Sequence, residues 1–135
     1  MILIRPYRGS DHDFICSSYL NSTYFNSIDK STRQVKKHDH DLAMDRKINS
    51  LIGESVVLVA CPEDDPELIV GYLIGVHNVL HYIYVKKDFR QMGVCNELLK
   101  YSNLPHDIFV THLSKNSAHI TSKFVEYTYN PYIFA

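Results

Sequence analysis

The sequence predicts a single α/β domain, spanning residues 1–135, in which helices flank a mixed, mostly antiparallel central sheet. Short runs of β-branched and aromatic residues, bounded by proline, glycine and acidic turns, indicate strands. Longer stretches with apolar residues at helical spacing separate these runs and indicate helices. A chain of 135 residues can bury most of its apolar surface in one core, so we expect these elements to form one domain.

The N-terminal residues 1–7 are apolar and β-branched, and Pro6 ends them, which predicts a first strand. A helix over residues 11–21 follows, because Ser10 or Asp11 can cap it and apolar residues then recur at helical spacing.

Residues 22–53 are polar and show the weakest pattern. Helical spacing returns at Ile48 and Leu51, which predicts a variable loop and then a helix over residues 39–52, closed by Gly53.

After this helix the apolar pattern becomes that of strands. Two valine- and isoleucine-rich runs, residues 55–61 and 68–76, flank the acidic, proline-rich turn PEDDPE and predict an antiparallel hairpin. A third strand, residues 79–85, follows a turn at residues 77–78.

The rest of the chain predicts two further strands and two helices. An amphipathic helix follows a glycine turn and stops before Pro105. Residues 107–112 predict a strand and residues 114–120 a short capped helix. Residues 128–134 (TYNPYIF) predict a terminal strand with an edge or a break at Pro131.

The composition excludes several classes of protein. Apolar residues at 45% and charged residues at 21% are ordinary for a globular chain and argue against disorder. A net charge of −1 gives no basic field for gripping nucleic acid. The three cysteines are widely spaced, which indicates reduced thiols. Without an apolar run that could span a bilayer or serve as a signal peptide, we expect a cytoplasmic protein with no membrane partner. We also expect no metal, because the alternating histidines and aspartates at residues 38–41 lack a defined metal-ligand spacing.

Residues 79–102 carry the strongest functional signal: a buried strand, the turn Arg90-Gln91-Met92-Gly93-Val94-Cys95 and a helix. Gly93 lets the backbone approach a ligand closely. Unpaired N–H groups and the positive end of a helix converge after such a turn and form a site for an anion. For the turn alone, an ordinary glycine turn before a helix is the alternative.

Arg-x-x-Gly-x-small after a strand ending in Val85 resembles the acyl-CoA diphosphate loop of the GCN5-related N-acetyltransferases, with Cys95 where that family has Gly or Ala. The order of elements and the opening Ile-Arg-Pro strand are also similar to that family. The resemblance implies a strand that splays from its successor and holds the pantetheine arm of acetyl-CoA, followed by a loop that holds the diphosphate. The residues assigned in this way are Ile83, Tyr84 and Val85 on the strand, Arg90, Gln91, Met92, Gly93, Val94 and Cys95 in the loop, and Asn116, which contacts the cofactor arm.

The family's catalytic groups are only partly present. The usual carboxylate base before Val85 is absent, but counting back by twos along the strand reaches His81, whose imidazole can accept a proton. A buried histidine bonded to a neighbouring strand is the alternative, and His77 and His112 are lesser candidate bases. The position of the family's tyrosine acid is Lys123 here, and the nearest tyrosine is Tyr127. Either Tyr127 acts as the acid or the thiolate leaves without one; an aromatic strand residue is the alternative.

The resemblance therefore implies an acetyl-CoA-dependent N-acetyltransferase whose acceptor is an amine of a small molecule, a protein or a modified base. In this family residues equivalent to 22–53 lie beside the acceptor pocket, so we expect them to determine the acceptor. The short chain and the segments HYIYVKKDFR and YTYNPY resemble acetyltransferase-like proteins of tailed bacteriophages. The alternative is thus a virion structural or accessory protein, with weak or no catalysis, that acts as a homo-oligomer or an assembly partner.

Overall fold

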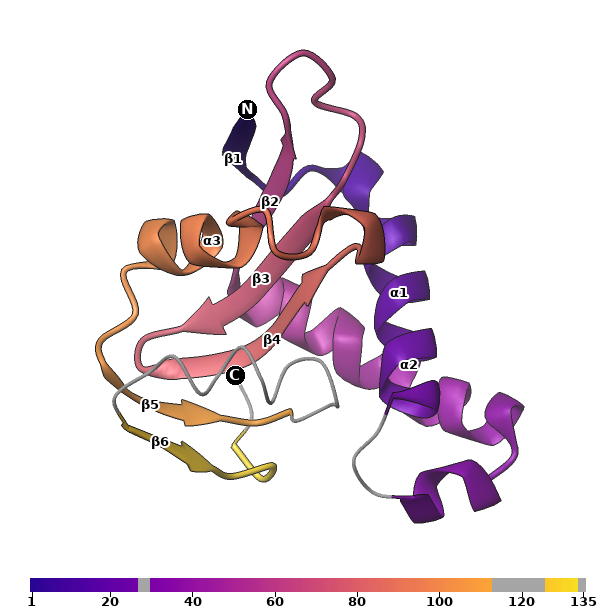
Figure 1. Cartoon of the computed structure of the whole chain (residues 1–135). Coiled ribbons are helices and arrows are strands. Elements are labelled where there is room, and N and C mark those ends of the chain that lie inside the picture. Colours follow the sequence, from indigo (N-terminus) through magenta and orange to yellow (C-terminus); the bar gives the residue numbers. More distant parts are fainter. Residues whose placement is uncertain (27–29, 113–125, 134–135) are drawn as a thin grey trace.

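The computed structural model describes residues 1–26, 30–112 and 126–133, and its strands and helices are shown in Figure 1. The strands are β1 (Ile2–Pro6), β2 (Val56–Pro62), β3 (Gly71–Val76), β4 (Val79–Val85), β5 (Asp107–Val110) and β6 (Glu126–Tyr129). The α-helices are α1 (His12–Phe25), α2 (Lys37–Glu54) and α3 (Val94–Ser102). Short 3-10 turns at Gly9–Asp11, Lys30–Gln34 and Lys87–Phe89 precede the three helices.

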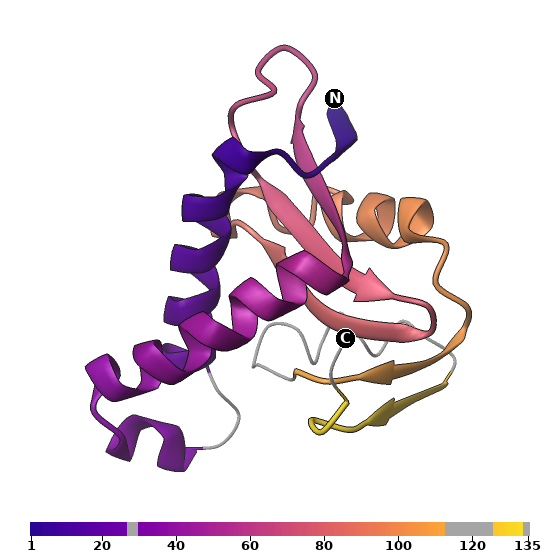
Figure 2. The ribbon, with the colours of Figure 1, turned by 180° about the vertical axis from the view of Figure 1, so that it is seen from behind.

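The six strands form one sheet in the order β1-β2-β3-β4-β5-β6. The first four strands pair antiparallel with their neighbours, and β5 and β6 join in parallel. Helices α1 and α2 cover one face of the sheet, and α3 covers the other (Figures 1 and 2). The predicted α/β fold with a mixed, mostly antiparallel sheet is confirmed. None of the described helices has the length and apolar character that crossing a lipid bilayer requires.

Aromatic side chains dominate the face of the sheet that α1 and α2 cover. Tyr72 of β3 lies stacked against Tyr84 of β4, with ring centroids 5.3 Å apart. Tyr82 of β4 meets Tyr19 of α1 edge to face at 5.1 Å. Tyr19, Tyr72 and Tyr82 are buried, and Ile48 of α2 closes the same core. Alternate residues of β4 therefore point at α1 and α2.

The face of the sheet that α3 covers carries aliphatic side chains, which are smaller than the tyrosines of the other face. Val94 and Leu98 of α3 pack on Ile83 and Val85 of β4 in one buried cluster. This packing fixes the N-terminus of α3 directly beside the end of β4, so the position of the connecting turn depends on this core.

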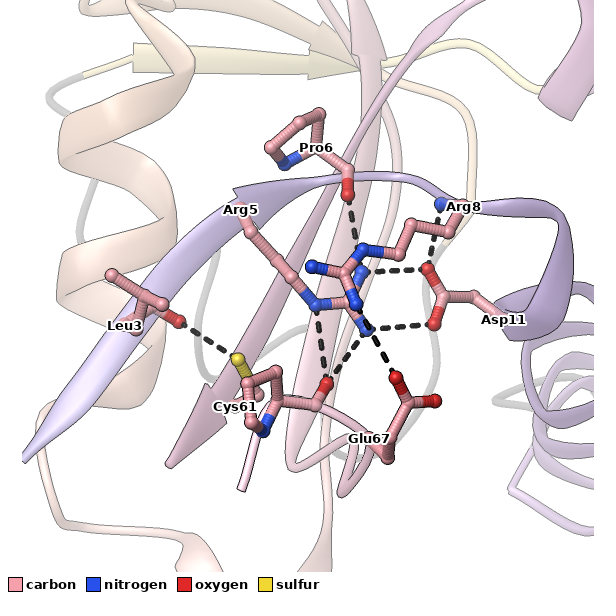
Figure 3. A network of polar contacts seen from close by, with 8 residues as sticks. Leu3, Arg5, Pro6, Arg8, Asp11, Cys61 and Glu67 are labelled. Carbon is pink, nitrogen blue, oxygen red and sulfur yellow. Dashed lines mark hydrogen bonds and ion pairs between the residues drawn. The ribbon is translucent and has the colours of Figure 1, made fainter. Parts of the chain in front are cut away.

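A buried ion pair fixes the N-terminal strand to the start of α1 (Figure 3). Arg5 donates two hydrogen bonds of 2.8 Å to the Asp11 carboxylate and two more, of 3.0 and 3.2 Å, to the carbonyl oxygen of Pro66. Asp11 also accepts the backbone N–H of Arg8, while Arg8 makes an exposed ion pair with Glu67. Arg5 therefore holds three segments together: β1, the start of α1 and the β2–β3 connection.

Several predicted boundaries differ from the structure. Helix α1 continues to Phe25, four residues past its predicted end. The prediction that Gly53 closes α2 is wrong, because α2 ends at Glu54 with Ser55 in an extended conformation. The terminal strand is β6, which ends at Tyr129, while Pro131 lies in a turn. The helix predicted at residues 114–120 lies outside the described residues.

Gly71 lies where β3 and β4 approach most closely. A Cβ atom there would lie 2.7 Å from the backbone oxygen of Tyr84 and 3.2 Å from the Val94 side chain. We expect Gly71→Ala to lower the free energy of unfolding by about 1–3 kcal/mol, because neither strand can yield without a backbone shift. Gly53→Ala is the matched control: nothing lies within 4 Å of its added Cβ, so it should stabilise the exposed end of α2 by about 0.5–1 kcal/mol. Urea denaturation of both variants measures this, and equal effects would contradict the close approach of the strands.

Candidate functional site

Strand β4 separates from β5 after its first two residues. The two strands pair only at Val79 and Leu80, so β5 leaves the edge of β4 before His81. Among the described residues, no strand pairs with this edge from His81 to Val85. The predicted splay is therefore present.

The backbone of the unpaired part of β4 alternates in direction. The Lys86 N–H donates to the Val70 oxygen, which places the polar backbone groups of Tyr84 and Lys86 toward β3. Those of Ile83 and Val85 point away from β3, toward the open edge. The Val85 oxygen accepts a 2.9 Å bond from Nε of Arg90. Arg90 thus closes the end of the open edge, and Ile83 lies in its middle.

A β-bulge at His81 interrupts this alternation. Ile74 pairs with Tyr82 and Gly75 with Leu80, so His81 is the extra residue of β4. Counting by twos from Val85, as the sequence interpretation did, therefore does not give the direction of the His81 side chain. The bulge lies at the point where β5 leaves β4.

The turn between β4 and α3 has two left-handed residues. Gln91 has φ of 66° and Gly93 has φ of 83°, and α3 begins at the next residue, Val94. The N-cap residue is Gly93, which has no side chain to cap the helix. Left-handed residues close together turn successive N–H groups to one side, and the positive end of α3 adds to their field.

The space in front of Gly93 is open, since a Cβ built there would meet nothing within 4 Å. Met92 and Gln91 are exposed, whereas Val94 is buried and Cys95 half-buried against the aliphatic core. The turn therefore offers N–H groups, a positive helix end and free space, which fits the diphosphate of an acyl-CoA.

Two cavities lie along β4 on the face covered by α1 and α2. The first, here the α1 cavity, measures about 350 Å³ and lies between Arg90, Tyr84 and one side of α1. Serine and asparagine side chains line that side of the helix, among them Ser18 and Asn21. Polar groups therefore line one side of the cavity, while Phe14 and Phe25 add apolar surface.

The second, here the α2 cavity, measures about 260 Å³. Helix α2 lines it with Lys47, β4 contributes Tyr82, and Thr111 and His112 reach it from the end of β5. Tyr129, the last residue of β6, also lines it.

A chain of hydrogen bonds connects the α2 cavity to the bulge in β4. The Tyr19 hydroxyl lies 2.7 Å from Nε2 of His112, whose Nδ1 lies 2.8 Å from Oγ1 of Thr111. Thr111 Oγ1 lies 2.9 Å from Nδ1 of His81. Thr111 Oγ1 also donates to the backbone oxygen of His81 at 3.3 Å. One set of tautomers satisfies all four contacts: Tyr19 donates to Nε2 of His112, and the Nδ1–H groups of His112 and His81 both donate to Thr111. Nε2 of His81 then carries a lone pair, is buried and has no partner among the described residues.

Both histidines are uncharged in the folded chain. Burial, reinforced by the charge of Lys47, lowers the pKa of His81 to about 4 and that of His112 to about 3. Burial also raises the pKa of Tyr19 far above its usual range. The chain of hydrogen bonds is therefore neutral near pH 7.

This burial gives a testable pH dependence. Unfolded histidines titrate near pH 6.5, so between pH 6.5 and 4 the unfolded state binds more protons than the folded state. The free energy of unfolding therefore falls as the pH falls. We expect the free energy of unfolding to drop by roughly 3–4 kcal/mol between pH 7 and pH 5. The His112→Gln variant should lose about half of this slope. Protonation of His12 has the opposite effect on stability, because its bond to Asn49 raises its pKa in the folded chain. His12 is unchanged in His112→Gln, so the difference between the variant and the native chain reports on the buried pair. Urea denaturation at several pH values measures the slope, and a flat profile would contradict neutral burial.

The remaining predicted residues are less central. Tyr127 lies in β6 opposite Ile108 of β5, with 38% of its surface exposed, and it does not line either cavity. Asn116 lies outside the described residues. Sequence reasoning missed Tyr19, Thr111 and Lys47. A usable signal existed for Lys47, a cation four residues before Leu51 on the apolar side of α2.

No protein-family model and no curated protein matches the sequence. Solved structures do match. The chain is similar to a GCN5-related N-acetyltransferase from Rhodopseudomonas palustris, with a TM-score of 0.63 and 17% identity over 90% of this chain and 78% of that one. It is also similar to a protein from Pyrococcus furiosus assigned as an acetyl transferase, with a TM-score of 0.59 and 12% identity over 98% and 84% of the two chains. A third match is YjaB from Escherichia coli in its apo form, with a TM-score of 0.53 and 18% identity over 76% of this chain. The chain spans 64% of the length of YjaB.

Proposed function

We propose that this chain, which has the fold of the GCN5-related N-acetyltransferases, binds acetyl-CoA and transfers its acetyl group to an amine. The observation that supports this most is the adjacency of the left-handed turn at Gly93, at the start of α3, and the open edge of β4. In acetyl-CoA a diphosphate is joined to an extended arm that carries amide groups. The turn would bind the diphosphate, and the adjacent open edge of β4 would bind the arm.

Different residues are proposed to bind these two parts of acetyl-CoA. The backbone amides of residues 91–95 hold the diphosphate, and Arg90 adds a positive charge beside it. The backbone of residues 83–85 binds the pantetheine arm as a neighbouring strand would. Asn116 is proposed as a further contact to the arm.

His81 is the proposed proton acceptor. Its Nε2 is the buried atom without a partner, and it belongs to the bulge where the open edge begins. A neutral imidazole can accept a proton from the attacking amine at Nε2, and Thr111 then accepts a hydrogen bond from Nδ1 of the imidazolium that forms. Tyr127 is proposed as the acid that protonates the leaving thiolate.

A second candidate function is binding of acyl-CoA without transfer, as in a structural or accessory virion protein. One observation favours it: no carboxylate lines either cavity described above. Fixed stoichiometry of the protein in a virus particle would support this role directly.

Release of free coenzyme A over a panel of amines and peptides distinguishes the two functions. The transferase predicts amine-dependent release that falls at least tenfold in His81→Gln, with the affinity for acetyl-CoA unchanged. His81→Asn keeps an amide near the Nδ1 position and controls for lost contact with Thr111. Acetyl-CoA binding with no release for any amine would contradict the transferase.

A further inference from the structure

The α2 cavity holds a cation without a counter-ion. Lys47 projects from α2 into the cavity and is half-buried there. It forms no ion pair with any of the described residues. Burial lowers its pKa, which reflects the cost of removing the ammonium from water.

The acids nearest to Lys47 along α2 do not supply this counter-ion. Asp41 is bonded by Lys37 at 2.6 Å and by His40 at 2.9 Å. Asp45 lies on the side of the helix that faces His12 and Cys16, where it influences their titration. None of the described residues that line the cavity carries a carboxylate.

Hydroxyl groups and a histidine share the described lining with Lys47. His112 is uncharged near pH 7. Thr23, Thr32 and Thr111 contribute hydroxyl groups from three different parts of the chain. A single ammonium in such a lining attracts a carboxylate or a phosphate and repels a second cation.

We propose that the α2 cavity binds the carboxylate or phosphate of a small acceptor, with Lys47 as its counter-ion. A volume of about 260 Å³ is near the lower end of ordinary small-molecule sites and suits an amino-acid-sized group. Pairing a buried, uncompensated charge yields more than pairing an exposed one, because its water has already been removed.

This inference rests on the proposed function and narrows its substrate class. The acceptor is an amine that also carries an acidic group, such as an amino acid or an amino phosphate. The lining residues of α1, of the 3-10 turn Lys30–Gln34 and of α2 then select the acceptor through its acid rather than through its amine. A simple polyamine would be rejected by the Lys47 charge.

The three methionines provide a direct test, since their methyl groups lie in different places. Met44 lines the α2 cavity, Met92 lies on the β4–α3 turn, and Met1 is exposed at the N-terminus. With methyl-labelled methionine, sodium phosphate and sodium propionate are titrated separately against sodium chloride at equal ionic strength. We expect a saturable shift of the Met44 signal, and the tighter of the two probes names the acidic group.

Variants of α2 complete the test. Lys47→Gln should weaken the binding reported by Met44 at least tenfold, and Lys47→Arg should retain it. Arg46→Gln removes an exposed charge from the neighbouring position and should behave like the native chain. A Met44 shift that is absent, or equal in Lys47→Gln and the native chain, overturns the proposal.

The result at Met44 does not depend on whether acetyl-CoA binds at the turn between β4 and α3. Acetyl-CoA should shift Met92 in the native chain and in Lys47→Gln alike, so an unmoved Met92 refutes the proposed function and leaves the cavity result standing. Acetylation of lysine against cadaverine then tests the substrate class. The amino acid should have the higher kcat/KM by tenfold or more in the native chain, and this ratio should disappear in Lys47→Gln; equal ratios in both would contradict the inference.

Discussion

Replacing Gly93 with glutamate is expected to weaken acetyl-CoA binding at least 100-fold, which corresponds to about 2.7 kcal/mol. The added side chain enters the open space in front of the turn, where the diphosphate is proposed to lie. Its carboxylate also neutralises the positive end of α3 and repels the phosphates. Calorimetric titration of acetyl-CoA into the native chain and the variant measures the loss.

Gly93→Asn separates the charge from the backbone cost. Any non-glycine residue at φ of 83° costs about 1–2 kcal/mol of stability, and asparagine tolerates this region best. We expect Gly93→Asn to unfold at nearly the same urea concentration as Gly93→Glu but to keep its affinity to within about tenfold. Native affinity in Gly93→Glu would show that the turn does not hold the diphosphate.

Asp11→Ala is expected to lower the free energy of unfolding by about 3–5 kcal/mol, the largest stability effect we anticipate. The change leaves the Arg5 guanidinium buried, with only carbonyl oxygens as partners (Figure 3). Burial alone would raise the pKa of Asp11, but the bonds from Arg5 and from the Arg8 N–H outweigh it and lower the pKa. The pair therefore contributes fully above about pH 4 and is lost only as pH falls below it.

Glu67→Ala is the matched control for this ion pair. It removes the exposed partner of Arg8, whose ion pair is 3.3 Å long with half or more of both side chains in solvent. Such pairs contribute between zero and about 1 kcal/mol, so urea denaturation at pH 7 should show little change. Similar losses in Asp11→Ala and Glu67→Ala would contradict a buried clamp at Arg5.

The local part of the site could be predicted from the sequence because it is encoded by neighbouring residues. The strand before Val85, the turn at Gly93 and the amphipathic helix each have a periodicity or a glycine signal within a short window. Their packing follows from the same pattern, since Val94 and Leu98 recur at helical spacing and contact β4. The splay followed from the family resemblance.

The rest of the site depends on contacts between distant residues, which periodicity cannot give. The bulge at His81 arises from its register with β3, and Thr111 meets His81 only because β5 joins β4 for two residues. Tyr19 and His112 are 93 residues apart in sequence and lie in hydrogen-bond contact. For the same reason the spacing of Lys47 places it on the apolar side of α2 but does not show that it lines a cavity, which forms only when α2 packs over the sheet.

The most direct test of the donor site is a titration of the ¹⁵N-labelled chain with acetyl-CoA, followed at the backbone amides. The account predicts saturable shifts that are largest at residues 91–95, with smaller shifts along residues 83–85 and none at β1. Saturable shifts elsewhere, or no shift at any amide, would contradict the claim that the turn between β4 and α3 holds the diphosphate.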